Sequence, residues 1–272
     1  MHFESDHGPI VYDISGPEDA PAVVFTHGLS MDRRTFDVQV EALSDQYRVV
    51  TWDMPGHGES VEFDGRRFTF ALMAECLVGV MDDAGIDRAA LLGVSLGSLV
   101  NQYVAYHHPE RVTAVIDVGG LPLHKQMSAG SSMAWRMAAL LGTLIPEKTY
   151  YRLFAKERST DEDTRRYMEE CIAEMGKRQV RRFTNAYIAD QTEGIPAPPE
   201  QPLLIINGEE EISFVATRSQ QWHEEIPNSR RVVIDEAGHI ANQDNPEVFN
   251  QTVATFLQSV DERAVNKSKH GP

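Results

Sequence analysis

The stretch AALLGVSLGS at residues 89–98 decides how the rest of the chain is interpreted. Its four leading apolar residues predict a buried strand, and residues 99–106 predict a helix. Between them stands Gly-x-Ser-x-Gly, the pattern of a nucleophile elbow, in which a serine lies on a sharp turn from a strand into a helix. The two glycines mark where the two backbones pass too closely for a side chain. We therefore expect Ser95 to expose its hydroxyl in strained backbone geometry, with the amide of Leu96 free to stabilise an oxyanion.

Runs typical of strands alternate with runs typical of helices on both sides of this stretch. Strands are predicted at residues 22–26, 47–52, 112–118, 203–207 and 231–234, a hairpin at 2–14, and helices at 35–43, 70–84, 214–225 and 246–259. This alternation indicates an α/β fold with a mostly parallel central sheet and flanking helices.

The alternation breaks between residues 121 and 199, where no convincing strand is found. Helical patterns cover residues 132–144, 147–155, 161–175 and 177–190, and a proline-rich run marks the return to strands. The domains predicted from this are a core of residues 1–120 and 200–260, an inserted all-helical cap of residues 121–199 over the site, and a polar, frayed C-terminal tail of residues 261–272.

Polar loops follow several predicted strands, which is where α/β sheets place their ligands. The first buried strand runs into the loop His27–Ser30, so the amide of Leu29 is the expected second oxyanion donor. His27, and His57 in a later turn-rich loop, are interpreted as structural residues rather than as catalytic bases.

An acidic run follows the strand at 203–207, and His239 follows the final strand. Serine, acid and histidine therefore occur in the chain order of one serine-hydrolase layout among several unrelated ones. This order makes His239 the expected base for Ser95.

Four motifs together resemble those of the α/β-hydrolase fold superfamily, and in particular its small capped esterase-like members. They are Thr-His-Gly-Leu at residues 26–29, Asp-Met-Pro-Gly-His-Gly-Glu-Ser at 53–60, Gly-Val-Ser-Leu-Gly at 93–97 and Ala-Gly-His at 237–239. The resemblance covers roughly residues 10–260 and implies that fold for nearly the whole chain.

The position at which such members carry the triad aspartate is occupied by Glu211, so the resemblance implies a Ser-His-Glu triad. A glutamate is chemically acceptable because the acid only orients the imidazole and stabilises its cation. Glu210 and Asp117 remain as alternative acids. The elbow also carries Ser98 where many relatives have a glycine, a change expected to affect helix packing rather than chemistry.

The predicted cap carries apolar side chains at helical spacing, most of which are expected to pack it against the core. Trp135, Met133 and Met137, together with Ile240 beside His239, are expected to line a substrate pocket. An apolar roof favours an ester or lactone with a hydrocarbon acyl portion, cleaved through an acyl-enzyme. A resemblance to acyl-homoserine lactone hydrolases makes such lactones one candidate substrate.

Two other functions remain open. Some relatives keep a complete triad and act as ligand-sensing signalling receptors with slow turnover. The same pocket also serves carbon–carbon hydrolases, perhydrolases and thioesterases. Turnover of short p-nitrophenyl esters at ordinary enzyme rates distinguishes the esterase or lactonase from the receptor.

The 272-residue chain contains 25 Lys and Arg against 41 Asp and Glu, a net charge of −16. This balance argues against a nucleic acid or an anionic membrane as partner. Cys76 and Cys171 match no metal or redox spacing and are interpreted as buried thiols, so no metal or other cofactor is expected. No signal-peptide pattern is visible, and no apolar run approaches the roughly 20 residues of a membrane span. These features predict a cytoplasmic protein, monomer or homodimer, that acts on a small molecule.

Overall fold

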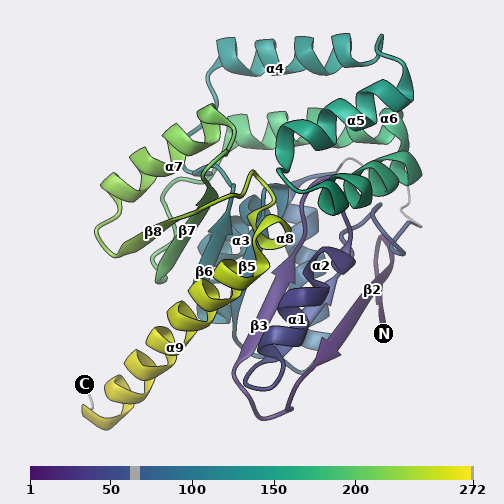
Figure 1. Ribbon diagram of the computed structural model, residues 1–272. Coiled ribbons are helices and arrows are strands. Elements are labelled where there is room, and N and C mark those ends of the chain that lie inside the picture. The colour runs from purple at the N-terminus through teal and green to yellow at the C-terminus, as the bar shows by residue number, and fades with distance from the viewer. Residues whose placement is uncertain (62–67, 271–272) are drawn as a thin grey trace.

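A sheet of eight strands forms the centre of the computed structural model, which describes residues 1–61 and 68–270 (Figure 1). The strands are β1 (His2–Ser5), β2 (Gly8–Ser15), β3 (Ala22–Thr26), β4 (Arg48–Trp52), β5 (Ala89–Val94), β6 (Val112–Val118), β7 (Leu203–Gly208) and β8 (Ser229–Ile234). Their order in the sheet is β1-β2-β4-β3-β5-β6-β7-β8. β2 pairs antiparallel with β1 and β4, and the remaining pairs are parallel. The predicted α/β fold with a mostly parallel sheet is confirmed.

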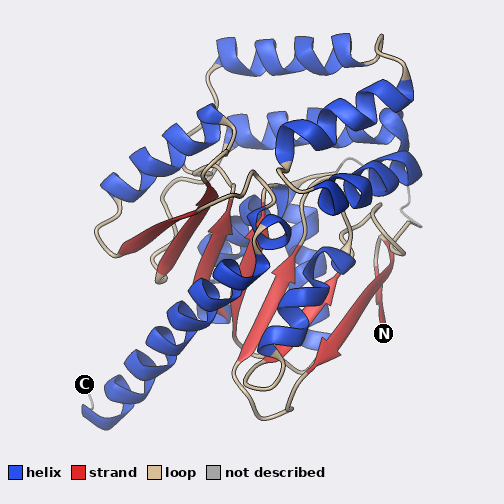
Figure 2. Cartoon of the chain, in the orientation of Figure 1, coloured by secondary structure: helices blue, strands red, loops and turns tan. Residues whose placement is uncertain are grey.

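Helices cover both faces of this sheet (Figure 2). One face packs against α2 (Phe70–Asp83), α3 (Leu96–His107) and α7 (Ser213–Glu225), and the other against α1 (Asp37–Leu43) and α9 (Pro246–His270). Successive side chains of β5 point to opposite faces, so Leu91 belongs to the first hydrophobic cluster and Leu92 to the second. Burial on both faces explains why this strand is a continuous apolar run.

In the described chain, three helices stand between β6 and β7: α4 (Ala129–Gly142), α5 (Glu147–Arg158) and α6 (Glu162–Glu193). We call them the inserted helices. Figure 1 shows them above the edge at which the parallel strands end. Gly176, with φ 75° and ψ 147°, interrupts α6 at the boundary between two predicted helices. Ala155 of α5 and Met168 of α6 join the hydrophobic cluster that contains Leu92, so the inserted helices share a core with the sheet.

The last helix is longer than predicted. α9 continues to His270, so residues 261–270 of the predicted frayed tail are helical, and residues 271–272 lie outside the described residues. The helix continues because neither glycine nor proline occurs between Glu247 and His270. Three short helices complete the described chain: η1 (Arg33–Phe36), η2 (Pro109–Arg111) and α8 (Ala241–Asp244). Among the described helices, none combines the length and the apolar character that crossing a membrane requires.

Candidate active site

The turn from β5 into α3 has the geometry expected of an elbow. Ser95 has φ 52° and ψ −112°, a positive-φ conformation that is costly for a residue with a side chain. A Cβ atom on Gly93 would lie 2.5 Å from the backbone of Gly97, and one on Gly97 would collide with the carbonyl oxygen of Thr26. Both glycines are therefore required for the close approach of strand and helix, as the sequence predicts.

Ser98 ties the elbow to the neighbouring strand. Its buried hydroxyl donates a hydrogen bond to the carbonyl oxygen of Gly93 at 2.5 Å and accepts one from the amide of Val118 at 3.2 Å. The amide of Ser95 donates to the carbonyl oxygen of Val118 at 2.7 Å. Ser98, which the sequence assigned to helix packing, thus also supports the backbone of the elbow by hydrogen bonding.

Glu211 follows β7 and His239 follows β8, and the two side chains form a buried pair. Nδ1 of His239 lies 2.7 Å from Oε1 of Glu211, and the side chains are 5% and 1% exposed. The backbone amide of Ile212 donates to the same oxygen at 2.8 Å, and the side-chain amide of Asn207 donates to Oε2 at 3.4 Å. Burial acts to raise the pKa of Glu211, but the charge of His239 and these hydrogen bonds outweigh it and hold that pKa below its ordinary value. The Glu211 carboxylate is therefore ionised at neutral pH and can stabilise a His239 cation.

The other two candidate acids lie elsewhere. Glu210 is exposed to solvent. Asp117 is fully buried in β6, where its carboxylate accepts hydrogen bonds from Nε2 of Gln102 and the amide of Gly120, each at 2.9 Å. Burial raises the pKa of Asp117 to about 7, although these hydrogen bonds oppose the shift. Within the described residues, Glu211 is the one of the three acids that contacts His239.

The end of β6 links the elbow to the His239–Glu211 pair. Gly119 directly follows Val118, whose carbonyl oxygen accepts the amide of Ser95. A Cβ atom on Gly119 would lie 2.8 Å from Nδ1 of His239 and 3.1 Å from Oε2 of Glu211. Ser95 is half-buried, and its hydroxyl makes no hydrogen bond to His239 or to another residue in the described part of the chain. That oxygen is therefore not committed to another structural contact.

The loop after β3 also lies against the elbow. A Cβ atom on Gly28 would lie 3.5 Å from the Cβ atom of Ser95. Leu29 follows Gly28, and Leu96 opens α3 directly after Ser95. As far as the structure describes the chain, neither leucine amide donates a hydrogen bond, so both N–H groups are available to an oxyanion.

Comparison with known proteins identifies the fold family. A family model described as alpha/beta hydrolase fold matches residues 21–246. The chain belongs to the α/β-hydrolase fold family. It is 27% identical over 251 residues to 3-oxoadipate enol-lactonase 1 of Acinetobacter baylyi, covering 91% of this chain and 92% of that protein. The family resemblance found in the four sequence motifs is confirmed.

Solved structures share the fold. The enol-lactonase from Burkholderia xenovorans superposes with a TM-score of 0.79 at 22% identity, over 95% of this chain and all (100%) of that one. A thermophilic esterase from Thermogutta terrifontis superposes with a TM-score of 0.81 at 22% identity, over 96% of this chain and 98% of that one.

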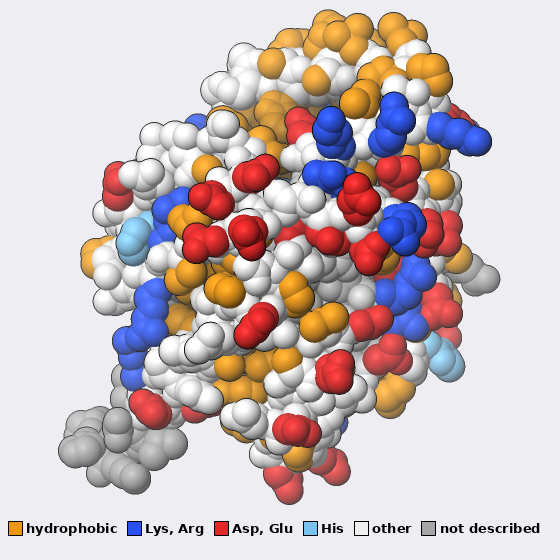
Figure 3. Space-filling view, in the orientation of Figure 1, with side chains coloured by type: hydrophobic (Ala, Val, Ile, Leu, Met, Phe, Trp, Pro, Cys, Tyr) orange, Lys and Arg blue, Asp and Glu red, His pale blue; other side chains and the backbone are white. Residues whose placement is uncertain are grey.

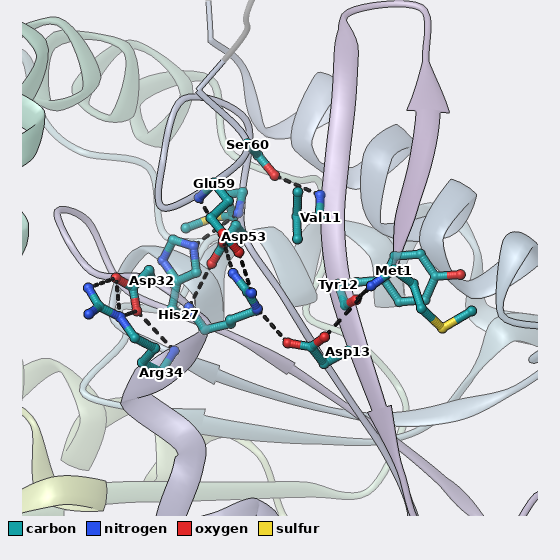
Figure 4. Close-up of polar contacts among 12 residues, drawn as sticks. Met1, Val11, Tyr12, Asp13, His27, Asp32, Arg34, Asp53, Glu59 and Ser60 are labelled. Carbon is teal, nitrogen blue, oxygen red and sulfur yellow. Dashed lines mark hydrogen bonds and ion pairs between the residues drawn. The ribbon is translucent and has the colours of Figure 1, made fainter.

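In this α/β-hydrolase, an ion-pair network supports the loops beside the site (Figure 4). The guanidinium of Arg33 contacts the carboxylates of Asp13, Asp53 and Glu59. Asp53 also accepts hydrogen bonds from the amides of Arg33 at 2.8 Å and Glu59 at 2.9 Å. The loops after β3 and β4 are thereby joined. Sequence reasoning missed Arg33, because one arginine in a charged chain does not reveal which distant carboxylates the fold brings to it.

His27 and His57 occupy positions that fit their interpretation as structural residues. Nε2 of His27 (Figure 4) accepts the amide of Met54 at 3.0 Å. Its Nδ1 atom lies 2.8 Å from the carbonyl oxygen of Gly28. Both histidines are buried, and burial lowers the pKa of each ring. They are therefore neutral at physiological pH and hold their loops by hydrogen bonding and ring contact.

Asp244 connects the histidine loop of this hydrolase to the inserted helices. Its Oδ2 atom accepts hydrogen bonds from the amides of Gly238 at 2.8 Å and Thr160 at 3.0 Å, while Oδ1 accepts the hydroxyl of Ser159 at 2.6 Å. Gly238 precedes His239, and the other two residues join α5 to α6. Asp244 was not predicted, because one acid among many carries no sequence signal for such a contact.

The predicted pocket residues differ in exposure. Met133 and Met137 are 63% and 48% exposed on α4, while Trp135 on the same helix is half-buried. This exposure does not fit the prediction that the two methionines enclose a pocket, because helical spacing alone does not say which face turns to the core. Ile240 is buried beside His239, and its amide donates to the carbonyl oxygen of Arg158 at 3.1 Å.

Proposed function

We propose that this α/β-hydrolase is a serine hydrolase that cleaves a carboxylic ester or lactone through Ser95, His239 and Glu211. The observation that carries the proposal is the meeting of three loops at the end of β6, where Gly119 lies against the paired His239 and Glu211. A serine on a strained elbow, a histidine and a buried carboxylate supply a nucleophile, a base and an orienting acid.

In the proposed reaction, His239 takes the proton of the Ser95 hydroxyl as that oxygen attacks the carbonyl carbon. The amides of Leu29 and Leu96 donate to the oxyanion that forms. The bond to the alcohol oxygen then breaks, His239 returns the proton to that oxygen, and an acyl group remains on Ser95. Water attacks this ester as His239 removes its proton, releasing the acid and the free serine. Glu211 orients the imidazole and stabilises its cation throughout.

A lactone or ester is supported by the name of the Acinetobacter relative, an enol-lactonase that is 27% identical to this chain. We also propose that residues 121–199 act as a cap on the site. The inserted helices stand over the edge at which β5, β7 and β8 end (Figure 1), and the loops of Ser95, Glu211 and His239 follow those strands. The cap and the histidine loop are joined through Asp244.

Replacing the nucleophile tests the proposal. Ser95→Ala should reduce kcat by roughly 10⁴–10⁶-fold with little change in circular dichroism, and a fluorophosphonate should label Ser95 of the wild-type protein alone. The control is Ser213→Ala, which alters an exposed serine at the start of α7. Esters, lactones and thioesters with one common acyl chain identify the substrate class. A folded Ser95→Ala variant with wild-type turnover would contradict the assignment of the nucleophile.

A further inference from the structure

The outer face of α4 is apolar and open to solvent. Five large side chains on this helix and just beyond it are about half exposed or more: Met133 63%, Met137 48%, Leu140 52%, Leu141 55% and Leu144 79%. Figure 3 shows hydrophobic side chains gathered over α4 at the top of the molecule. A contiguous exposed apolar face of this kind marks an interaction surface. It lies on the outside of the inserted helices and takes no part in the proposed chemistry.

Positive charge accompanies this face. Residues 126–146, which include α4, contain Arg136 and no Asp or Glu. Residues 176–189 of α6 contain four basic side chains, Lys177, Arg178, Arg181 and Arg182, and again no acid. Nζ of Lys177 donates to the carbonyl oxygens of Thr143, at 3.0 Å, and Ile145, so the two segments are adjacent. These two segments therefore carry net positive charge within a chain of net charge −16, although Glu147 and Asp190 directly follow them.

Local charge determines what this surface attracts. Electrostatic interactions between exposed groups are screened beyond about 8 Å at physiological ionic strength, so distant acids of the core do not cancel the basic residues beside α4. A second copy of the chain, docked α4 to α4, would bring two such positive regions together. An anionic lipid surface instead offers negative headgroups to the basic side chains and an acyl boundary to the apolar ones.

We propose that α4 and the adjoining basic segment of α6 dock this protein on anionic lipid surfaces. The five apolar side chains enter the boundary between headgroups and acyl chains, and Arg178 and Arg181, both exposed, contact the headgroups. The net charge argues against an anionic membrane as partner, but it is an average over the whole chain. The charge is unevenly distributed, and the region of α4 and α6 is basic. Docking through α4 holds the catalytic edge of the sheet toward the lipid (Figure 1).

Sedimentation with lipid vesicles tests this proposal. The full-length protein is mixed with phosphatidylcholine vesicles, with or without phosphatidylglycerol, at low and high salt. One variant carries Leu140→Asp and Leu144→Asp, and a second carries Arg178→Gln and Arg181→Gln. The matched control is Val38→Asp on α1, because Val38 is 51% exposed and Leu140 is 52% exposed. Circular dichroism verifies that each variant is folded.

We expect binding to the vesicles that contain phosphatidylglycerol, weakened by high salt and by roughly tenfold or more in both double variants. Val38→Asp should bind like the wild type. Absence of binding to the anionic vesicles, or equal binding to both kinds, would overturn the proposal. Sedimentation velocity without lipid gives a further test. A wild-type dimer that the Leu140→Asp and Leu144→Asp variant dissociates would also overturn the proposal, since the face would then join two copies of this chain.

Discussion

Glu211 carries its two principal contacts on one carboxylate oxygen. Oε1 accepts the amide of Ile212 at 2.8 Å and faces Nδ1 of His239 at 2.7 Å. The backbone amide therefore fixes the direction in which the longer side chain meets the imidazole. For a glutamate in the proposed role of orienting acid, this contact takes up the extra methylene, because the side chain is held against the amide of the next residue.

Replacing this acid should affect turnover far more than folding. We expect Glu211→Gln to lower kcat by up to about 10⁴-fold, because a neutral amide does not stabilise the His239 cation. Glu211→Asp should retain part of the activity, since the charge survives while the reach shortens. Glu210→Gln, at the exposed neighbouring residue, serves as the control and should be nearly normal. Steady-state hydrolysis of p-nitrophenyl acetate measures kcat of all three variants. A folded Glu211→Gln protein with wild-type kcat would contradict the assignment of Glu211 as the orienting acid.

Asp117 should make the stability of the protein depend on pH. Burial raises its pKa to about 7 in the folded chain, whereas an unfolded aspartate titrates near about 3.9. Between these values the unfolded chain loses a proton that the folded chain keeps, so this residue makes stability fall as pH rises from about 4 to about 7. Above that range both states are ionised and the dependence ends.

The variant Asp117→Asn lacks this titration. We compare the free energy of unfolding of the wild type minus that of the variant at two pH values. This difference should be about 2.5 kcal/mol larger at pH 5 than at pH 8, since each pKa unit corresponds to about 1.4 kcal/mol. Urea denaturation at the two pH values measures the difference. The variant should also be destabilised at both, because its amide group meets the donor of Gln102. A difference that does not change with pH would refute the titration of Asp117 in this range.

At the scale of elements, Asp244 joins the inserted helices to the histidine loop by hydrogen bonds. Asp244→Asn puts an NH₂ group where the carboxylate accepts hydrogen bonds from Gly238, Thr160 and Ser159, so at least one acceptor is lost. We expect the free energy of unfolding to fall by about 1.5–3 kcal/mol and kcat to fall with it, since Gly238 adjoins His239. Denaturation and steady-state kinetics measure both effects.

Asp235→Asn is the matched control for this change. Asp235 lies in the same segment between β8 and α8, and its side chain is exposed. The substitution Asp235→Asn should leave both the free energy of unfolding and kcat near their wild-type values. Equal behaviour of the two variants would mean that Asp244 does not position the histidine loop.

The elements differ in how far sequence predicts them. β3 and β6 have the predicted bounds, residues 22–26 and 112–118, because each is an apolar run bounded by turn formers. Ser95 and His239 could be proposed from the sequence because motif residues occupy fixed offsets from such strands. The contacts of Arg33 and Asp244 were not, since they join segments far apart in the chain. The orientation of α4 was also missed, because a helix that is apolar over most of its surface does not reveal its inner face.

At the scale of the whole molecule, the inserted helices and the sheet should unfold together. Ala155 and Met168 lie in the same hydrophobic cluster as the sheet, and the amide of Phe70 donates to Asp190 of α6 at 2.6 Å. Trp135→Phe leaves Trp52 and Trp222, both in the core, as reporters of the sheet. In this variant we expect urea curves from fluorescence and far-UV circular dichroism to superimpose. A loss of circular-dichroism signal at lower urea concentrations than the change in fluorescence would show that the inserted helices unfold separately.

The insertion leaves the sheet after β6 and returns to it in β7, and these two strands are direct neighbours, with Val115 opposite Leu203. Its entry and exit are therefore fixed by strand pairing, whatever the length of chain between them, and closing a longer loop there costs little additional entropy. Residues 121–199 should thus tolerate insertions and substitutions, provided that contacts such as those of Ala155 and Met168 are preserved. A change in the length of the segment above the site would therefore leave in place the strands that precede the proposed reacting residues.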